Sequence, residues 1–495
     1  MLEVIILAAG KGTRMVSDLP KVLHEVAGKP MLQHVLDTCQ ELGADRLHVV
    51  YGFGGDLLRE KIHNENVNWV LQAEQKGTGH AVNIAMEHVN DDSTVLILYG
   101  DVPLISKVSL NTLTQVCGEN SVGLMTACLN EGGTYGRIQR DEYQNFQSII
   151  ENRDANEEQK KITEINAGLL SGPAKKIKYW VSKLGCENAQ GEYYLTDIFA
   201  MAIAEGVVVE TCQPVDNDEI LGINDRQNLS VIERIYQKKQ SDKYLMEGLT
   251  ISDPARFDVR GSLIHGKDCC VDINVVIEGN VTLGDRVSIG PNTLLKNMVI
   301  GDDVEIKANC VLEDSSIGEL AIVGPYSRIR PESEIASFAH IGNFVEIKKS
   351  QVGSGSKVNH LSYIGDTEIG TDVNIGAGVI TCNYDGANKY KTIIGDKAFI
   401  GSGSQLVAPL KVGKGATIGA GSTITKNAPD DELTLSRAPL QTIKGWQRPV
   451  KKMRRKRTEI MCGITAGVSN ADVITSLLEG LKRLEYHGYD SQVWR

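Results

Sequence analysis

The sequence is poor in aromatic residues and rich in glycine. Phe, Trp and Tyr together make up 5% of the 495 residues, whereas glycine occurs 50 times. Aromatic side chains usually fill much of a large globular core. The imbalance therefore indicates that part of the chain has an unusual architecture with a core of small side chains.

Long apolar runs, net positive charge and paired cysteine motifs are also absent. The opening run MLEVIILAAG is short and has no basic leader, so we expect neither a signal peptide nor a membrane span. Lys and Arg number 52 against 63 Asp and Glu, and this net charge of −11 argues against a nucleic-acid partner. None of the ten cysteines forms a CxxC pair, and scattered cysteines are typical of a reducing compartment. We therefore expect a cytoplasmic protein.

The first half of the chain alternates strand and helix patterns. Val4–Leu7, Leu47–Tyr51 and Val95–Tyr99 are short apolar runs, and amphipathic stretches such as Met31–Leu42 lie between them. This alternation predicts an α/β domain over residues 1–226 with a Rossmann-like, mostly parallel sheet. Ligands of such folds bind beyond the carboxyl ends of the strands.

The pattern changes near residue 250. Leu229, Ile232 and Tyr236 fall at helical spacing, which predicts a linker helix over 227–247. From there on, an aliphatic residue followed by glycine recurs after six residues, a spacing typical of a β-helix, which we expect over 248–453. The pairs begin at Leu283 and Ile289, Ile317 and Val323, Ile369 and Ile375, Ile394 and Ile400, and Val412 and Ile418. We expect the aliphatic residues to point inward and each glycine to turn the corner.

A glycine-rich segment, LAAGKGTRM, follows the first predicted strand. It matches neither the P-loop nor the GxGxxG motif, but small residues allow a close backbone approach to phosphate. Together with Leu19-Pro20-Lys21, it resembles the signature of the sugar-1-phosphate nucleotidyltransferases. The resemblance implies that the nucleotide triphosphate is bound by Leu7, Ala8, Ala9, Gly10 and Lys21.

Further matches to this family follow in order. The segment Gln72–His80 resembles the base-reading segment, which implies that Gln72, Gly77 and Thr78 contact uracil. Tyr99, Gly100 and Asp101 end a predicted strand, where a carboxylate suits Mg²⁺. By the same resemblance, the remaining matches are sugar-binding Gly136, Glu151 and Asn166, and Asn224 as a second metal ligand beside Asp101.

These residues suit one reaction. A sugar-1-phosphate oxygen attacks the α-phosphorus of a nucleoside triphosphate, and pyrophosphate leaves. Because the attacking phosphate is already an anion, no general base is needed. The enzyme must position two anions and neutralise their repulsion, a role for Lys21, Arg14 and Mg²⁺.

Interruptions of the hexapeptide repeat carry a second set of motifs. They are Ile329-Arg330-Pro331, Val345–Lys349, Asn359–Tyr363, Asn374–Gly378 and Ile380–Gly386. With the N-terminal motifs, they resemble the bacterial bifunctional N-acetylglucosamine-1-phosphate uridyltransferases and glucosamine-1-phosphate acetyltransferases, from residue 1 to about residue 452. The resemblance implies a left-handed parallel β-helix and a cytoplasmic homotrimer that uses Mg²⁺, acetyl-CoA and UTP. Its product, UDP-N-acetylglucosamine, would supply peptidoglycan and lipopolysaccharide synthesis.

The resemblance also assigns residues of the acetyl transfer. His360 would be the catalytic base, because imidazole can accept a proton from the sugar amine near neutral pH. Glucosamine-1-phosphate would be bound by Arg330, Lys348, Tyr363 and Asn374. Acetyl-CoA would be bound by Ala377, Asn383, Tyr384, Ser402, Ala420 and Arg437. Cys382 lies beside this set, but nothing in the sequence activates its thiol, so we expect direct transfer.

The last segment departs from this pattern. Residues 454–495 resemble the start of the glutamine-dependent glucosamine-6-phosphate synthases, in which the counterpart of Cys462 is an N-terminal nucleophile. Here the amine of Cys462 is locked in a peptide bond, so we expect no glutaminase activity. The basic stretch Arg448–Arg457 is expected to be a solvated tail.

Two other interpretations stay open. The chain could be a single-function nucleotidyltransferase whose β-helix serves only oligomerisation, but a scaffold does not need His360 with Asn383 and Tyr384. It could also resemble non-enzymatic subunits of a eukaryotic translation-initiation exchange factor. The intact loop with Asp101 and Asn224 argues against that use.

Overall fold

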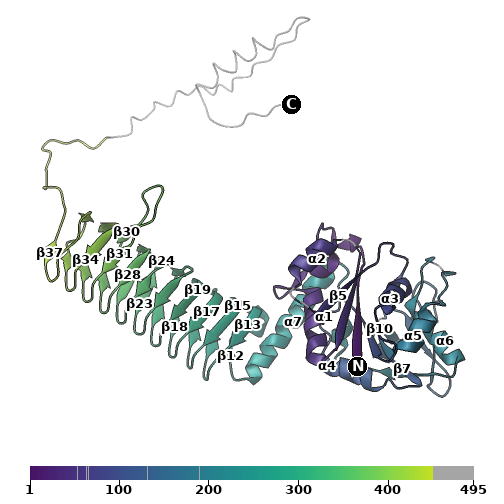
Figure 1. Ribbon diagram of the computed structural model, residues 1–495. Coiled ribbons are helices and arrows are strands. Elements are labelled where there is room, and N and C mark those ends of the chain that lie inside the picture. The colour runs from purple at the N-terminus through teal and green to yellow at the C-terminus, as the bar shows by residue number, and fades with distance from the viewer. Residues whose placement is uncertain (53, 63, 65, 131, 189, 450–495) are drawn as a thin grey trace, which may run out of the picture. The chain divides into compact units, whose positions relative to one another are not determined.

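The computed structural model describes residues 1–449 except 53, 63, 65, 131 and 189. Within it, residues Met1–Arg437 form one compact unit, in which an α/β region is followed along the chain by a β-helix (Figure 1). The segment 454–495 with Cys462 lies outside the described residues. In the described part of the chain, no helix is long and apolar enough to cross a membrane.

The α/β region is built on a nine-stranded, mostly parallel sheet, as the sequence predicts. Its main strands, in spatial order, are β11 (Val208–Cys212), β7 (Ser121–Cys128), β10 (Glu164–Pro173), β6 (Thr94–Tyr99), β1 (Leu2–Ala8), β4 (Arg46–Tyr51) and β5 (Val67–Leu71). β1 pairs in parallel with β4 and β6, whereas β10 runs antiparallel to β6 and β7. The hairpin of β8 (Arg137–Arg140) and β9 (Phe146–Ile150) joins β10 through β8.

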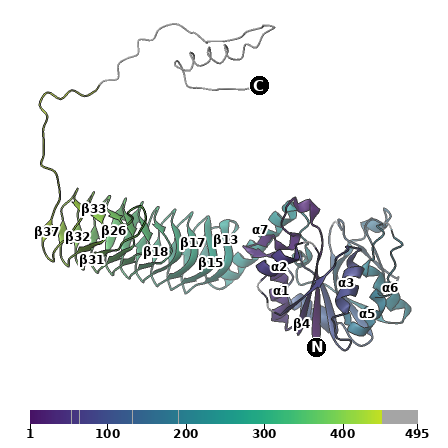
Figure 2. The ribbon, with the colours of Figure 1, turned by 45° about the horizontal axis from the view of Figure 1, so that its top comes forward.

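Helices cover both faces of this sheet (Figures 1 and 2). Alternate residues of β1 enter two separate cores: Val4 and Ile6 pack on one face, Ile5 and Leu7 on the other. The first core is shared by α1 (Met31–Leu42), α2 (Gly55–Lys61) and α4 (Lys107–Gln115). The second core is shared by α3 (Thr78–Met86), α5 (Ala174–Val181) and α6 (Ile198–Ala204).

The carboxyl end of β1 lies at the centre of this arrangement. The connection from β1 to β4 runs through α1 on one face, and the connection from β5 to β6 runs through α3 on the other. The loops after the neighbouring parallel strands β1 and β6 therefore lie side by side at the carboxyl ends of these strands, where an open α/β sheet usually binds its ligand.

The helix α7 (Arg226–Met246) lies between the two regions along the chain. Asp225 caps it by accepting a hydrogen bond from the backbone N–H of Asn228, at 2.8 Å. At its far end, the ring of Tyr244 packs edge-on against Phe257 of the first β-helix coil.

The predicted left-handed β-helix follows, and all its strands pair in parallel. One sheet contains β12 (Thr250–Ile251), β14 (Cys270–Val271), β16 (Ser288–Ile289), β18 (Glu305–Ile306), β20 (Ile322–Val323), β23 (His340–Asn343), β26 (Lys357–His360), β29 (Asn374–Ile375), β32 (Phe399–Ile400), β35 (Thr417–Ile418) and β37 (Leu433–Thr434). The long strands β13 (Phe257–Ile264), β15 (Val275–Leu283), β17 (Leu294–Ile300) and β19 (Val311–Ile317) begin the other two faces. These continue as β21 (Arg328–Ile329), β24 (Glu346–Lys348), β27 (Tyr363–Gly365), β30 (Ile380–Cys382), β33 (Gln405–Val407) and β36 (Thr423–Ile424) on the second face. The third face continues as β22 (Ser333–Ile335), β25 (Gln351–Val352), β28 (Thr367–Ile369), β31 (Thr392–Ile394) and β34 (Leu410–Val412).

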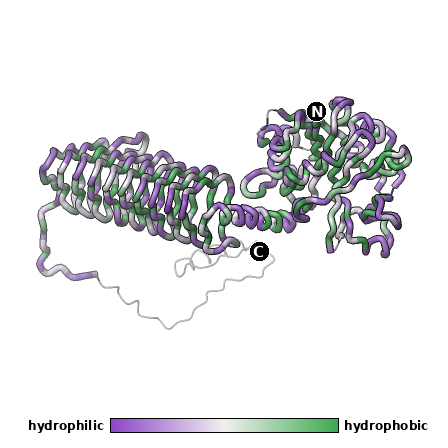
Figure 3. Tube along the Cα trace, turned by 90° about the horizontal axis from the view of Figure 1, so that it is seen from below, coloured by the Kyte–Doolittle hydropathy of each residue, from purple (hydrophilic) through white to green (hydrophobic). Residues whose placement is uncertain are grey.

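Successive coils of the β-helix stack in register. Residues at the same place in successive coils pair directly, as Ser288 does with Glu305 and Ile322 with His340. Aliphatic residues recur along every coil (Figure 3) and form one continuous core that includes Ile277, Leu295 and Leu312. Because aliphatic side chains fill this core, the β-helix needs few aromatic residues.

The repeat glycines have a different role from the one predicted. A Cβ on Gly284 would lie 2.2 Å from an oxygen of Asp302 in the next coil, so this glycine permits close stacking of coils. The positive φ of the corner falls two residues later, on Arg286 (58°). Gly301 is likewise followed, two residues later, by Asp303 with a positive φ of 57°. Glycine is therefore required here by the close approach of backbones rather than by the turn.

One coil is longer than its neighbours. Lys357 pairs with Asn374, but Asn374 pairs with Phe399, so the second of these coils contains additional residues. They leave the coil after β30 as a loop closed by a bridge between Tyr384 and Lys389 (Figure 1). The sequence predicts this loop from the segment Ile380–Gly386.

Candidate functional site

The predicted metal and phosphate residues of the α/β region lie together. Lys21 Nζ forms an ion pair with Asp101 and donates a hydrogen bond to Asn224 Oδ1 at 2.9 Å. Arg14 Nη2 donates to the same Asn224 oxygen at 3.1 Å. The side chains of Lys21 and Asp101 are 13% and 21% exposed, so the pair faces a partly enclosed space. Two cations therefore converge on two oxygen ligands.

Three remote segments build this cluster. Asp101 follows β6, Lys21 begins a short 3-10 helix (Lys21–Leu23), and Asn224 precedes α7. The backbone N–H of Ile223 donates to the carbonyl of Asp101 at 3.0 Å, which fixes the last segment beside the strand end. Gly12 has a φ of 58°, and a Cβ there would lie 2.6 Å from Cβ of Lys21. Gly12 thus lets the glycine-rich loop lie directly against Lys21.

Asp101 and Asn224 fit a divalent cation that takes its other ligands from a substrate. Among the described residues, no group of three or more His, Cys, Asp or Glu side chains could hold a metal. Mg²⁺ typically uses one or two carboxylates together with phosphate oxygens and water. An oxygen pair with adjacent cations suits a metal–triphosphate complex better than a bare metal.

The loop residues Leu7, Ala8 and Ala9 are buried where β1 ends, and Gly10 is exposed. Gly100 lies beside them, because a Cβ there would be 3.3 Å from Cβ of Ala8. The ends of β1 and β6 are therefore in contact, and the exposed backbone begins at Gly10.

The predicted base-reading segment is held by its own hydrogen bonds. Gln72 is buried, and its Nε2 donates to the carbonyl of Gly77 at 3.2 Å and lies 3.0 Å from Nδ1 of His80. Gly77 has a φ of 111° and directly precedes Thr78, the first residue of α3. A Cβ on Gly77 would lie 2.7 Å from the carbonyl oxygen of Tyr193, a residue that the sequence did not single out.

The predicted sugar residues Gly136, Glu151 and Asn166 come from the segments around β8, β9 and β10. The backbone N–H of Asn166 donates to the carbonyl of Gly136 at 2.9 Å. Burial raises the pKa of Glu151, and its carboxylate accepts a hydrogen bond from Thr196 at 3.0 Å. Burial, with the charges of Glu151 and Asp101, raises the pKa of Tyr99. The charges of Glu151 and Asp101 therefore both act on this phenol.

In the β-helix, His360 stands at a corner at the end of β26. It is exposed, and its Nδ1 lies 2.9 Å from Oδ1 of Asn343, its partner one coil earlier. An Nδ1–H donated to this oxygen leaves Nε2 free to accept a proton. Asn343 was not predicted, although the repeat places it one coil before His360.

The predicted acetyl-CoA residues follow His360 along the same corner, in later coils. The carbonyls of His360, Ala377 and Ser402 accept hydrogen bonds from residues one coil later, at 3.2, 2.7 and 2.8 Å. Ala420 follows in the next coil, beside Gly401. Arg437 lies at the top of this column, with Nη2 3.3 Å from a Cβ built on Gly419.

The predicted phosphate residues lie at the next corner. Arg330 forms an ion pair with Glu346 at 2.8 Å, and Lys348 ends β24 one coil later. The neighbouring Lys348 ammonium lowers the pKa of Lys389, an unpredicted residue of the inserted loop. Two lysine ammonium groups so close to each other form a favourable binding position for an anion.

Tyr363 and Asn383 span the face between these corners. The hydroxyl of Tyr363 and Nδ2 of Asn383 are 2.5 and 2.7 Å from a Cβ built on Gly365. Asn383 also donates a hydrogen bond to Asp366. In contrast, Asn374 lies on the first face of the β-helix, and Tyr384 hydrogen bonds within its own loop to Gly386. Asn374 thus shares its face with His360, and the Tyr384 hydroxyl is bound within the inserted loop.

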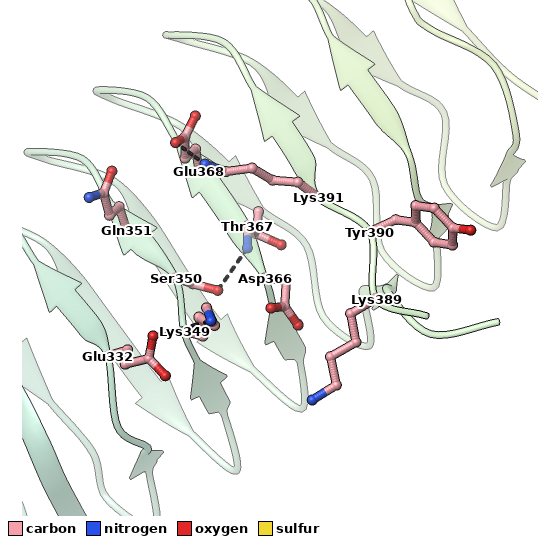
Figure 4. A pocket seen from close by; sticks show the side chains of 10 residues that line it. All are labelled: Glu332, Lys349, Ser350, Gln351, Asp366, Thr367, Glu368, Lys389, Tyr390 and Lys391. Carbon is pink, nitrogen blue, oxygen red and sulfur yellow. Dashed lines mark hydrogen bonds and ion pairs between the residues drawn. The ribbon is translucent and has the colours of Figure 1, made fainter. Parts of the chain in front are cut away.

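A cleft of about 350 Å³ lies beyond the corner of Lys348 (Figure 4). Its charged groups are partly paired, with Lys349 3.2 Å from Glu332 and Lys391 in an ion pair with Glu368. Asp366 and Lys389 line the side nearest the inserted loop. The cleft contains no predicted site residue.

Comparison with known proteins supports both halves of this description. Residues 4–154 match the family model of the MobA-like NTP transferase domain. Residues 263–297 and 391–426 match bacterial transferase hexapeptide repeats. The chain thus carries a nucleotidyltransferase domain followed by hexapeptide repeats of the transferase type.

Solved structures with a similar fold cover about half of the chain. A nucleotidyl transferase from Methanothermobacter thermautotrophicus is 15% identical, with a TM-score of 0.36, and covers 50% of this chain and 99% of its own. A UDP-glucose pyrophosphorylase in complex with UDP-glucose is 18% identical, with a TM-score of 0.40, 48% coverage of this chain and 98% of its own. A putative glucose-1-phosphate thymidylyltransferase from Bacillus anthracis is 16% identical, with a TM-score of 0.38, 48% coverage of this chain and 95% of its own.

Proposed function

We propose that the chain is a bifunctional enzyme. Its β-helix acetylates glucosamine-1-phosphate with acetyl-CoA, and its α/β region couples the resulting N-acetylglucosamine-1-phosphate to UTP. The products are UDP-N-acetylglucosamine and pyrophosphate. The observation that carries this proposal is the presence of two separate sets of groups, Lys21 with Asp101 and Asn224, and His360 with Asn343.

In the uridyl transfer, the chain positions two anions. Lys21 and Arg14 face the space where the sugar phosphate and the triphosphate meet, and they offset the repulsion between these groups. Asp101 and Asn224 would hold Mg²⁺, which adds positive charge at the phosphates. Gln72 and Thr78 would orient the base, while Glu151 and Asn166 would orient the sugar through its hydroxyl and amide groups.

In the acetyl transfer, His360 removes a proton from the sugar amine. The nitrogen lone pair then attacks the thioester carbon, and the CoA thiol leaves. Asn343 keeps the imidazole in the tautomer whose Nε2 accepts that proton. Partial burial raises the pKa of Cys382, which disfavours a thiolate and supports direct transfer.

The shape of the β-helix site suggests why the enzyme would act as a homotrimer. Tyr363 and Asn383 lie on a face between two corners, and the cleft of the β-helix lies beyond them. A second subunit could enclose such an open face and supply Asn374 or Tyr384 to it. The nucleotide and acyl-CoA substrates are consistent with a cytoplasmic enzyme.

The first test follows thiol release from acetyl-CoA in the presence of glucosamine-1-phosphate. We expect release by the wild type and a loss of at least about 10²-fold in His360→Ala, the usual contribution of a general base. His88→Ala is the matched control, because His88 is an exposed histidine of the α/β region and its loss should leave the rate nearly unchanged. A folded wild type without thiol release would favour the single-function alternative, provided that pyrophosphate release from UTP and N-acetylglucosamine-1-phosphate persists.

A further inference from the structure

A short segment of the α/β region, residues 193–196, lies along the side of the predicted nucleotide and sugar site. We call it the strap. Its first residue, Tyr193, donates a backbone hydrogen bond to Lys76 at 2.9 Å and accepts one from Gly79 at 2.8 Å. The backbone N–H of Leu195 donates to the hydroxyl of Thr78 at 3.2 Å. The strap is therefore fixed to the base-reading segment by three hydrogen bonds.

The last residue of the strap contacts the sugar side. Thr196 donates from Oγ1 to Oε1 of Glu151 at 3.0 Å. Leu195, next to it, is buried in the core that contains α3 and α6. The Thr196 hydroxyl is thus held in place by its neighbours before any ligand binds.

Glu151 is a half-buried carboxyl with other carboxylates near it. Burial raises its pKa, and the carboxylates of Asp154 and Asp197 raise it further, whereas the Thr196 hydrogen bond lowers it. The other titratable groups facing it are the phenols of Tyr99 and Tyr194, whose pKa values are raised in part by the charge of Glu151. Among the groups named, only Thr196 lowers the pKa of Glu151.

We propose that Thr196 is a positioning residue for sugar binding, which holds the Glu151 carboxylate in orientation through the anchored strap. The inference rests on the proposed uridyl transfer. An ionised, oriented Glu151 can accept hydrogen bonds from two sugar hydroxyls, whereas a protonated or rotated carboxyl loses at least one of them. The strap's three bonds to the base-reading segment use only backbone atoms of the strap, so they do not depend on the Thr196 side chain.

The test compares Thr196→Val and Thr196→Ser in the full-length protein, with UTP and N-acetylglucosamine-1-phosphate as substrates. We expect the KM for the sugar phosphate to rise about tenfold in the valine variant, since a hydrogen bond to a charged group is lost. The KM for UTP should change less than about twofold, because the anchors of the strap remain. Thr196→Ser should restore the sugar KM, and Thr114→Val, on an exposed face of α4, controls for the substitution itself.

The pH dependence separates positioning from general structural damage. In the wild type, the sugar KM should rise as the pH falls through the pKa of Glu151. Loss of the Thr196 bond raises that pKa, so in Thr196→Val the rise should begin at higher pH. Thr196→Ala should behave in the same way and replaces the valine variant if the latter does not fold.

Each outcome decides one point. An active valine variant with the sugar KM and pH profile of the wild type would overturn the inference and leave the uridyl transfer standing. Failure of the serine variant to restore the KM would also overturn it. A folded wild type that releases no pyrophosphate from this substrate pair would overturn the proposed function, and the inference with it.

Discussion

The two regions of the molecule build their sites in different ways. In the α/β region, Lys21, Asp101 and Asn224 come from segments far apart in the sequence and meet at one sheet edge. In the β-helix, residues at the same corner of successive coils meet, so Asn343 and His360 are only one coil apart. The first architecture makes a compact cluster from remote segments of one chain, whereas the second makes columns of side chains along the coils.

This difference explains how much each region can do alone. The cluster of Lys21, Asp101 and Asn224 is partly buried, and its cations already contact its oxygen atoms. The corner of His360 is exposed, and Lys348 lies at the next corner across the face of Tyr363. We therefore expect the α/β site to need only its own chain and the β-helix site to need a second copy.

The largest expected effect is on the nucleotidyl transfer. Lys21→Ala should lower the rate of pyrophosphate release by about 10²–10³-fold, since a charge aimed at the reacting phosphates is lost. Thiol release from acetyl-CoA should stay within about twofold, because the β-helix site shares no residue with this cluster. Lys29→Ala, which removes an exposed lysine paired with Asp37, is the matched control. Equal loss of both activities in Lys21→Ala would contradict the separation of the two sites.

A smaller effect is expected from the neighbour of the proposed base. Asn343→Ala should lower the rate of acetyl transfer about tenfold. Without the Asn343 oxygen, the His360 tautomer whose Nε2 accepts a proton is no longer favoured over the other tautomer. Asn343→Asp retains an acceptor for Nδ1–H and should recover most of the rate, with a pH optimum shifted upward because a carboxylate stabilises the imidazolium. A rate in Asn343→Ala equal to that of the wild type would show that Asn343 does not act through His360.

The smallest expected effect concerns stability. Ile6 and Ile347 are both fully buried, but in separate cores. Ile→Val at either position should lower the free energy of unfolding by about 0.5–1.5 kcal/mol, the usual cost of one buried methyl group. Because the cores share no residue, we expect each variant to shift a different part of the thermal unfolding curve, as measured by calorimetry. A common shift of the whole curve in both variants would indicate one cooperative unit.

Periodic features of the fold could be predicted from the sequence. The helix over Met31–Leu42 and the hexapeptide coils follow from apolar spacing, since period directly reports the buried face. The reason for the repeat glycines could not be predicted, because the approach of Gly284 to Asp302 depends on the next coil. That contact is a property of stacking rather than of local sequence.

The same limit applies to the sites. Lys21, Asp101 and Asn224 were identified through a family resemblance, and the structure brings them together. Tyr193 and Thr196 were not predicted, because their contacts with Gly79 and Glu151 join segments that are distant in the sequence. Lys389 was not predicted either, because only the folded loop places it beside Lys348.

Mixing two inactive variants tests the central claim, that the chain holds two independent sites, most directly. His360→Ala and Lys21→Ala are each supplied with glucosamine-1-phosphate, acetyl-CoA and UTP, and UDP-N-acetylglucosamine is measured by chromatography. We predict almost no product from either variant alone and ready formation by an equal mixture, since the acetylated intermediate diffuses from one protein to the other. A mixture as inactive as its components, beside an active wild type, would contradict the existence of two independent sites.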